Sequence, residues 1–380
     1  MSLIAALLLA AGGQGLLGRP CLAQEAGDDA RQEKAWKIET VDKKISLTNK
    51  MTILRRGKFE GEEESDFEKY YKGFSFPRWT APEYRSRQPW NGHLEIQKDI
   101  IGEIRRELND AEKAPDKQVY QKLCALVLEY MVPLAKGTDY HPLTRYNAMA
   151  AIAELNVPEA VPAFVDAIND PKQSDVVKVT AMIGLIRHAN PKLVGITDAE
   201  TLATVTKAMT TVAEAPVPDG DKADGVRWLR GQAAEVLGLL GSPGRNGAVA
   251  TALLKMIADP RLYLSQRVKA AAALGDLNWS GASMSAGPCL EALGGLAVDV
   301  VAVERQGSPS RRRVVGNAQN VLAGLKAADA LAKADEKKLA DGLRAAVEPL
   351  LDSKVTPEDL KQNLETATEK LAELVKKRSN

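Results

Sequence analysis

Hydrophobic positions in the middle of the chain recur at helical spacing within alanine-rich segments. Five segments share an alanine at the fourth position, a small or apolar residue at the seventh and a large residue at the eleventh. They begin at Arg145, Lys178, Arg230, Arg267 and Val315, so that four start with a basic residue. The steps between these starts are 33, 52, 37 and 48 residues, a spacing typical of stacked helical pairs.

Apolar periodicity, with turns rich in proline, glycine and aspartate between the segments, predicts five helical pairs. The expected pairs are 117–131 with 142–155, 159–169 with 174–189, 198–213 with 225–240, 246–258 with 265–277, and a fifth within 288–325. A helix precedes them over 94–111. One pair buries too little apolar surface to fold alone, so neighbouring pairs must stabilise one another.

The first 23 residues resemble an export signal. Leu3 to Ala11 is an apolar core, and Cys21-Leu22-Ala23 places small residues before a cut at Gln24. The alternative is a buried N-terminal helix. The core is too short to be a permanent membrane anchor, and we expect no membrane span after cleavage. We expect Cys124 and Cys289, 165 residues apart, to be buried thiols and not a disulfide.

Residues 24–93 are predicted to form an irregular, aromatic-rich segment. Nine of the 18 aromatic residues fall between Phe59 and Trp90, and interspersed prolines prevent one continuous helix. The acidic run 60–66 is expected to be a solvated loop, and residues 36–47 an extended segment or short hairpin. We interpret the aromatic stretch as a strap that caps the helical array. The alternative is a platform for a sugar or proline-rich peptide, formed by Trp79, Tyr84 and Trp90.

Two highly charged helices are predicted within residues 326–380. Thr356-Pro357 followed by two acidic residues is a strong helix start. We expect this hairpin to cap the array, which spans 94–325. A coiled-coil partner site is the alternative.

Helical pairs with an Asp-Pro turn and a basic residue early in the second helix resemble the HEAT-repeat family of armadillo-type α-solenoids. The resemblance covers residues 117–325 and implies an all-α, right-handed α-α superhelix. It also implies a structural ladder between turn aspartates and second-helix bases, here Asp170, Lys178, Asp259 and Arg267. The array behind a signal peptide is similar to exported bacterial HEAT-repeat proteins.

The charge balance and the lack of catalytic motifs limit the functions that the sequence favours. Lysine and arginine total 51 against 50 acidic residues, which provides no net basic field for nucleic acid. The three histidines, His93, His141 and His188, have no metal-ligand spacing, and no nucleophile or phosphate-binding motif accompanies them. We therefore expect no cofactor and no catalysis, and we interpret His188 as a packed interhelix residue.

The sequence favours an exported, periplasmic or extracellular scaffold that binds a protein or peptide. Arginine and aromatic residues at predicted helix starts are the candidate contacts. These are Arg145, Tyr146, Arg227, Trp228, Arg311, Arg312 and Arg313. The alternative function is an enzyme or enzyme accessory acting on an envelope polysaccharide or other polymer.

Overall fold

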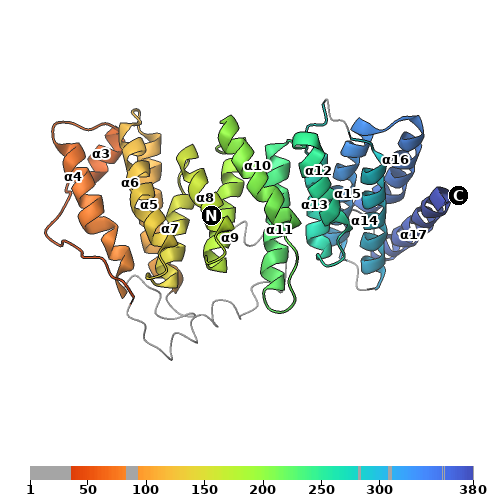
Figure 1. The fold of residues 1–380 in the computed structure, drawn as a ribbon, viewed down its shortest axis with the longest axis horizontal. Helices are drawn as coiled ribbons and strands as arrows, with labels where there is room; N and C mark the ends of the chain where they lie inside the picture. The colour runs from red at the N-terminus through yellow and green to blue at the C-terminus, as the bar shows by residue number, and fades with distance from the viewer. Residues whose placement is uncertain are drawn as a thin grey trace. The chain divides into compact units, whose positions relative to one another are not determined.

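The computed structural model describes residues 36–82, 93–280, 284–306, 310–352, 354 and 356–379. Across these residues the chain forms fifteen α-helices and no strand, so the expected all-α class is confirmed (Figure 1). The predicted signal peptide, Tyr84 and Trp90 lie outside the described residues. Contacts divide the chain into two units, Met1–Asn147 and Ala148–Asn380. The division falls inside α7 (Pro142–Ala153), and the domain limits expected from sequence stay predictions.

Unit 1 is more helical at its start than the sequence suggested. It contains α3 (Lys50–Arg56), α4 (Glu63–Tyr70), the π-helix η1 (Tyr71–Ser75), the 3-10 helix η2 (Pro77–Thr80), α5 (His93–Lys113) and α6 (Gln118–Lys136). The expectation of a wholly irregular segment was wrong, because Pro77 occupies the first turn of a new helix, where its missing N–H costs nothing.

The acidic run is also not simply a solvated loop. Its second half forms the first turn of α4, with Glu63, Glu64 and Asp66 near the positive end of the helix. Arg56 pairs with Glu63 and fixes this start. In contrast, residues 36–47 form neither helix nor strand and contain a turn in which the Ile45 N–H donates to the Asp42 carbonyl, so the hairpin alternative was wrong and the segment is not extended throughout.

The aromatic stretch forms the core of unit 1. Phe67, Tyr71, Phe76 and Trp79 are each at most 2% exposed. Ring centroids are 4.7 Å apart between Phe67 and Tyr71 and 5.1 Å apart between Tyr71 and Phe76. Such tilted contacts add stability beyond apolar burial. Concentrated aromatics therefore provide the local core that this short helical segment needs.

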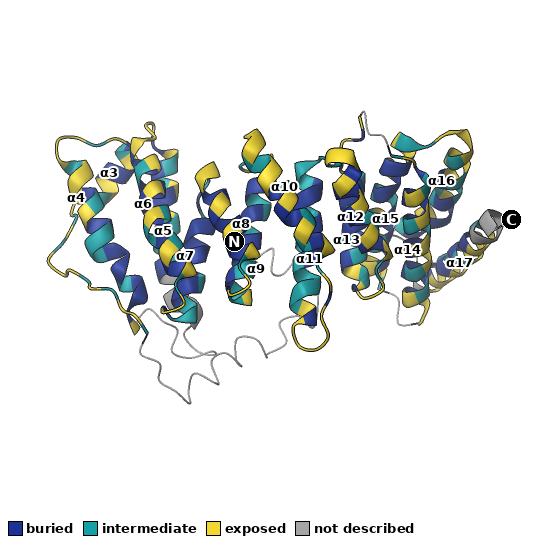
Figure 2. Ribbon diagram, viewed as in Figure 1, coloured by how far each residue is buried: buried dark blue, intermediate teal, exposed yellow. Residues whose placement is uncertain are grey.

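Unit 2 is a series of helical pairs, each packed on the next. The pairs are α8 (Val161–Asn169) with α9 (Asp175–Ala189), α10 (Ala199–Glu214) with α11 (Ala223–Leu240), α12 (Ala248–Ala258) with α13 (Leu264–Gly275), α14 (Gly287–Gln306) with α15 (Arg311–Leu331), and α16 (Ala334–Val347) with α17 (Pro357–Ser379). Up to α15, second helices pack on second helices and first helices on first helices, in two layers. In Figure 2 the helices of unit 2 carry buried residues on one side and exposed residues on the other.

Small residues explain the close approach of the second helices. A Cβ on Gly238 of α11 would lie 2.9 Å from Ala273 Cα of α13, and one on Gly324 of α15 would lie 2.9 Å from the Ala271 carbonyl oxygen. A Cβ on Gly275 would overlap the Ala323 carbonyl. The alanine-rich segments of α9, α11, α13 and α15 therefore lie side by side, as expected from their recurring pattern.

Local signals at helix ends are confirmed. The Thr356 hydroxyl accepts the Asp359 N–H at 3.1 Å, and Pro357 is the first residue of α17. Asp198, predicted to begin a helix, accepts the Thr201 N–H at 2.7 Å as the N-cap of α10. Cys124 and Cys289 are both buried thiols, as expected.

Candidate functional site

The outward side of α9 carries an unusual row of aliphatic residues. Val176, Val179, Ile183 and Ile186 recur at helical spacing and are all half-buried. The opposite side of the helix packs inward through residues that include Val177 and Leu185. A surface helix normally presents polar residues on its outward side. In α9 four aliphatic residues occupy that side, beside the half-buried Arg187.

The adjoining helix α11 extends this apolar surface. Trp228, Gln232, Glu235 and Leu239 share one side of α11 and are half-buried. Helices α9 and α11 pack against one another. We call Val176, Val179, Ile183, Ile186, Trp228 and Leu239 the apolar face. Toward α13 the surface becomes polar, where Lys269 Nζ lies 2.7 Å from Glu235 Oε2.

A polar network holds the N-terminal end of α11 beside this face. Arg227 Nη1 and the Tyr263 hydroxyl each donate to Asp224 Oδ1 at 2.7 Å. Arg227 Nε donates to the Arg261 carbonyl at 2.7 Å, and its guanidinium lies 4.8 Å from the Tyr263 ring centroid. The hydrogen bond from Tyr263 is the main cause that lowers the pKa of Asp224, followed by that from Arg227. Arg227 thus positions Tyr263, which is 44% exposed.

Three arginines at the aligned basic position of the second helices, of which only Arg267 was a predicted ladder residue, cap the preceding first helices. Arg145 Nε, Arg230 Nε and Arg267 Nε donate to the carbonyls of Ala135, Ala213 and Ile257, at 3.4, 2.8 and 2.7 Å. Each carbonyl belongs to the next-to-last residue of a first helix. Such carbonyls have no partner within their own helix, so the arginines satisfy the negative helix ends.

Two of these arginines also bridge successive pairs. Arg230 Nη1 lies 2.7 Å from Asp259 Oδ2, and Arg267 Nη2 lies 2.7 Å from Asp299 Oδ2. Burial raises the pKa of Asp259, but hydrogen bonds from the Arg261 N–H and from Arg230 outweigh it, with a net lowering. Asp170 instead accepts the Lys172 N–H within its own turn, and it forms no ion pair with Lys178 in the described structure.

Other predicted contacts lie in different surroundings. Arg145 is 8% exposed, so its assignment to a partner surface was wrong: its guanidinium is needed by the Ala135 carbonyl. Its neighbour Tyr146 is half-buried, and burial raises its pKa. Trp79 is 2% exposed and cannot serve as a ligand platform.

The triple arginine at the start of α15 is exposed. Arg313 reaches the fully buried Glu304, with Nε 2.5 Å from Oε1 and Nη2 2.9 Å from Oε2. The pair satisfies a carboxylate that would otherwise be buried without a countercharge. Arg313 is therefore structural, while Arg311 and Arg312 remain at the surface.

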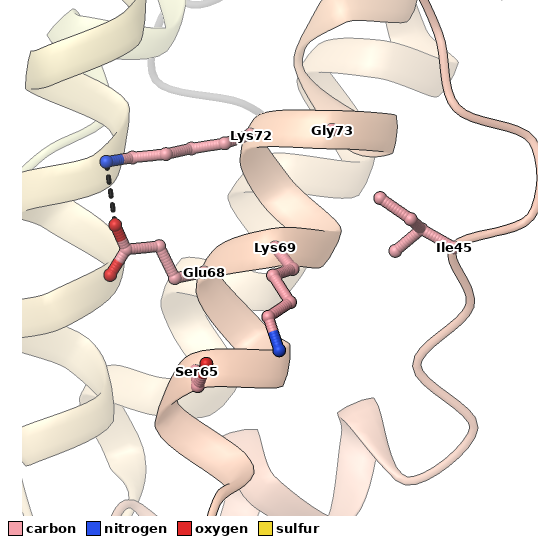
Figure 3. A pocket seen from close by; sticks show the side chains of 6 residues that line it. All are labelled: Ile45, Ser65, Glu68, Lys69, Lys72 and Gly73. Carbon is pink, nitrogen blue, oxygen red and sulfur yellow. Dashed lines mark hydrogen bonds and ion pairs between the residues drawn. The ribbon is translucent and has the colours of Figure 1, made fainter.

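Two hollows are notable among the described residues. The first, of about 550 Å³, lies in unit 1 between α4, η1 and Ile45 (Figure 3). Lys72 on its wall lies 2.7 Å from both Glu68 and Glu129. The second, of about 450 Å³, lies at the ends of α10 and α12, where Arg230, Lys255 and Arg261 are all engaged in ion pairs. These basic groups already neutralise nearby acids, and Arg230 also bonds the Ala213 carbonyl at the end of α10.

Metal-binding geometry is not found in the described chain, where no cluster of three or more histidine, cysteine, aspartate or glutamate residues could hold an ion. His188 is fully buried, with Nδ1 2.8 Å from the Gly184 carbonyl oxygen and Nε2 3.2 Å from that of Val157. The expectation of a packed histidine is confirmed.

Of the described helices, none combines the length and apolar character needed to cross a membrane.

Sequence reasoning missed a buried charged network in unit 1. Glu107, 3% exposed, accepts from Lys50 Nζ at 2.5 Å and from the Tyr71 hydroxyl at 2.7 Å. Burial raises the pKa of Glu107, and the Lys50 charge opposes that rise. The acid is four residues after Glu103 in α5, but its partners come from α3 and η1, which no local pattern indicates.

The aliphatic row of α9 was also missed, although a signal was present. Its four members are spaced by three, four and three residues, on the side opposite the core residues. Comparison with protein-family models, curated proteins and solved structures produced no match.

Proposed function

We propose that the protein is a non-catalytic, exported scaffold, a HEAT-like α-solenoid that binds a protein or peptide through the outward side of its second helices. The apolar face is the observation that carries this proposal. Five aliphatic residues and a tryptophan on the outward side of two adjacent second helices are the composition of a binding patch. Arg227 and Tyr263 provide a rigid polar margin.

The stacked pairs of unit 2 and the Arg230–Asp259 bridge support the HEAT-like assignment. A solenoid keeps its second helices in fixed register, so that a partner meets preformed contacts. Export is proposed on the apolar core and cleavage pattern of residues 1–23. A second function acting on an envelope polymer has less support, because the buried Trp79 removes one member of the suggested platform.

The test begins with photo-crosslinkers placed at Ile183 and Trp228 in the native envelope, followed by binding measurements with the purified partner. Ile183→Ser with Trp228→Ala is expected to weaken binding at least tenfold, because central apolar anchors dominate interface energies. Gln319→Ala, on the exposed side of α15, is the matched control and should bind normally. Unchanged binding by the double variant would refute the proposed face.

A further inference from the structure

Residues 36–47 form a strap along unit 1 that is neither helix nor strand and turns between Asp42 and Ile45. The backbone N–H groups of Lys37 and Asp42 donate to the carbonyls of Asp139 and Gly73 at 3.0 and 2.9 Å. The N–H of Glu39 donates to Thr80 Oγ1 at 2.8 Å. Lys37 and Glu39 are two residues apart, so an extended chain directs both N–H groups to the same side. The strap is thus bound through its main chain, as in peptide recognition by strand addition.

Side chains add a recognisable pattern to these main-chain bonds. The Trp36 and His141 rings meet edge to face, with centroids 5.5 Å apart. Lys37 Nζ lies 4.9 Å from the Tyr140 ring centroid, and Glu39 accepts from the Tyr140 hydroxyl. Lys37 and Glu39 also pair with one another at 3.0 Å. Tyr140 is therefore held between a base and an acid of the strap.

The strap is lightly held. No residue from Trp36 to Asn49 is buried, and Ile38 is 51% exposed. Fixing an extended backbone costs roughly 1–2 kcal/mol per residue, and little apolar burial offsets that cost here. Segments with few buried contacts open locally at low free energy. The surface beneath, in contrast, is firm: Tyr140 and Thr80 are buried, and Thr80 Oγ1 also donates to the Pro77 carbonyl at 2.8 Å.

We propose that the surface beneath the strap is a receptor for an extended segment of a partner protein, which displaces the strap and presents an aromatic residue, a base and an acid in the order of Trp36, Lys37 and Glu39. The receptor consists of Asp139, Tyr140, His141, Thr80 and Gly73. It lies within unit 1 and is independent of the apolar face of unit 2.

The hollow beside Ile45 explains why a partner segment is favoured over the strap of a second copy. A tethered strap competes at an effective concentration of roughly millimolar, so a displacing segment must make additional contacts. Ile45 only borders the hollow of about 550 Å³, touching Gly73 beside Lys69 and Lys72 (Figure 3). A larger apolar side chain at this position gains contacts that an identical strap cannot make.

The experiment uses the full chain carrying Trp36→Ala with Glu39→Ala to release the strap, and a fluorescein-labelled peptide of residues 36–47. Fluorescence polarisation should show at least tenfold tighter peptide binding to the released variant than to the wild type. The Ile38→Ala chain, altered at an exposed strap residue, should behave as wild type. Tyr140→Phe added to the released variant should weaken binding at least threefold. Equal peptide binding by the released and wild-type chains would overturn the proposal.

Two further measurements distinguish a partner segment from a second copy of this chain and control for misfolding of the variants. An Ile45→Phe peptide should bind more tightly than the native peptide; equal affinity, or strap-exchanged dimers of the wild type, would assign the receptor to a second copy and overturn the partner assignment. In the wild type, the amides of Lys37, Glu39 and Asp42 should exchange with deuterium at least a hundredfold faster than those of α6. Equal protection would show a permanent strap and overturn the proposal.

Discussion

At the scale of single residues, the fold decides whether a polar group is buried and what it contacts. His188 occupies a large-residue position in its repeat, and both ring nitrogens face backbone carbonyls. Burial is the main cause that lowers its pKa. A charged ring would donate to both carbonyls and a neutral ring to only one, so these hydrogen bonds raise the pKa, but burial outweighs them and keeps the ring neutral.

Because His188 is buried with a lowered pKa, we expect the free energy of unfolding to depend on pH. The unfolded chain takes up a proton near pH 6.5, while folded His188 stays neutral to lower pH, so the stability present above 6.5 is lost as the pH falls. Between pH 7.5 and 5.5 the loss is at most about 1.4 kcal/mol. Urea unfolding of the wild type and of His188→Gln at both pH values measures it. A pH-induced loss as large in the variant would contradict this prediction.

At the scale of helices, arginines in the second helix of a pair satisfy the end of the first. Arg230 is 4% exposed and bonds both to the Ala213 carbonyl and to Asp259 in the next pair. Lys178 occupies the aligned position but makes no such contact in the described structure. The alignment predicted a shared basic position, while the contacts show that arginine and lysine play different parts there.

Arg230→Ala is expected to lower the free energy of unfolding by about 3 kcal/mol, because it leaves a helix-end carbonyl and a partly buried carboxylate without a partner. Lys178→Ala is the matched control and should change it by less than about 0.5 kcal/mol. Chemical denaturation followed by circular dichroism compares the two. Similar values for both variants would mean that the Arg230 contacts contribute little.

At the scale of the molecule, the two units are separate clusters of contacts, and unit 2 consists of pairs that contact mainly their neighbours. Gly324 in α15 lies against Leu293 in α14 and Ala271 in α13. A side chain there affects three helices at once. A Cβ on Gly316, in the same helix, would meet nothing within 4 Å among the described residues, so this glycine provides a comparison within one element.

Gly324→Ala is expected to destabilise α13 to α15 by about 1–3 kcal/mol through overpacking. Hydrogen–deuterium exchange should accelerate in these helices and remain unchanged in α3 to α6, because stacked pairs transmit strain chiefly to neighbours. Gly316→Ala should slow exchange slightly, since alanine favours a helix. Faster exchange across both units would show that the chain unfolds as one cooperative body.

The sequence predicted the helices of unit 2 well, because the information is local. Apolar periodicity placed α9 between residues 174 and 189, and Thr356 marked a helix start through its own side chain. It also indicated that the alanine-rich segments lie side by side, since short side chains at fixed intervals permit close packing. The half-exposed Arg227 and Trp228 were predicted from their position at a helix start.

The tertiary structure alone decided which neighbours each side chain meets. Arg145 was predicted at a partner surface and Trp79, as the alternative, in a ligand platform, yet both are buried, and the partners of Glu107 lie 36 and 57 positions away in the chain. The aromatic stretch was predicted to be a strap over the helical array, but its rings form a core. Residues 36–47 form the strap instead. Helix formation depends on bonds four residues apart, which a sequence displays directly. Burial and ion pairing depend on contacts between distant segments, which exist only once the chain has folded.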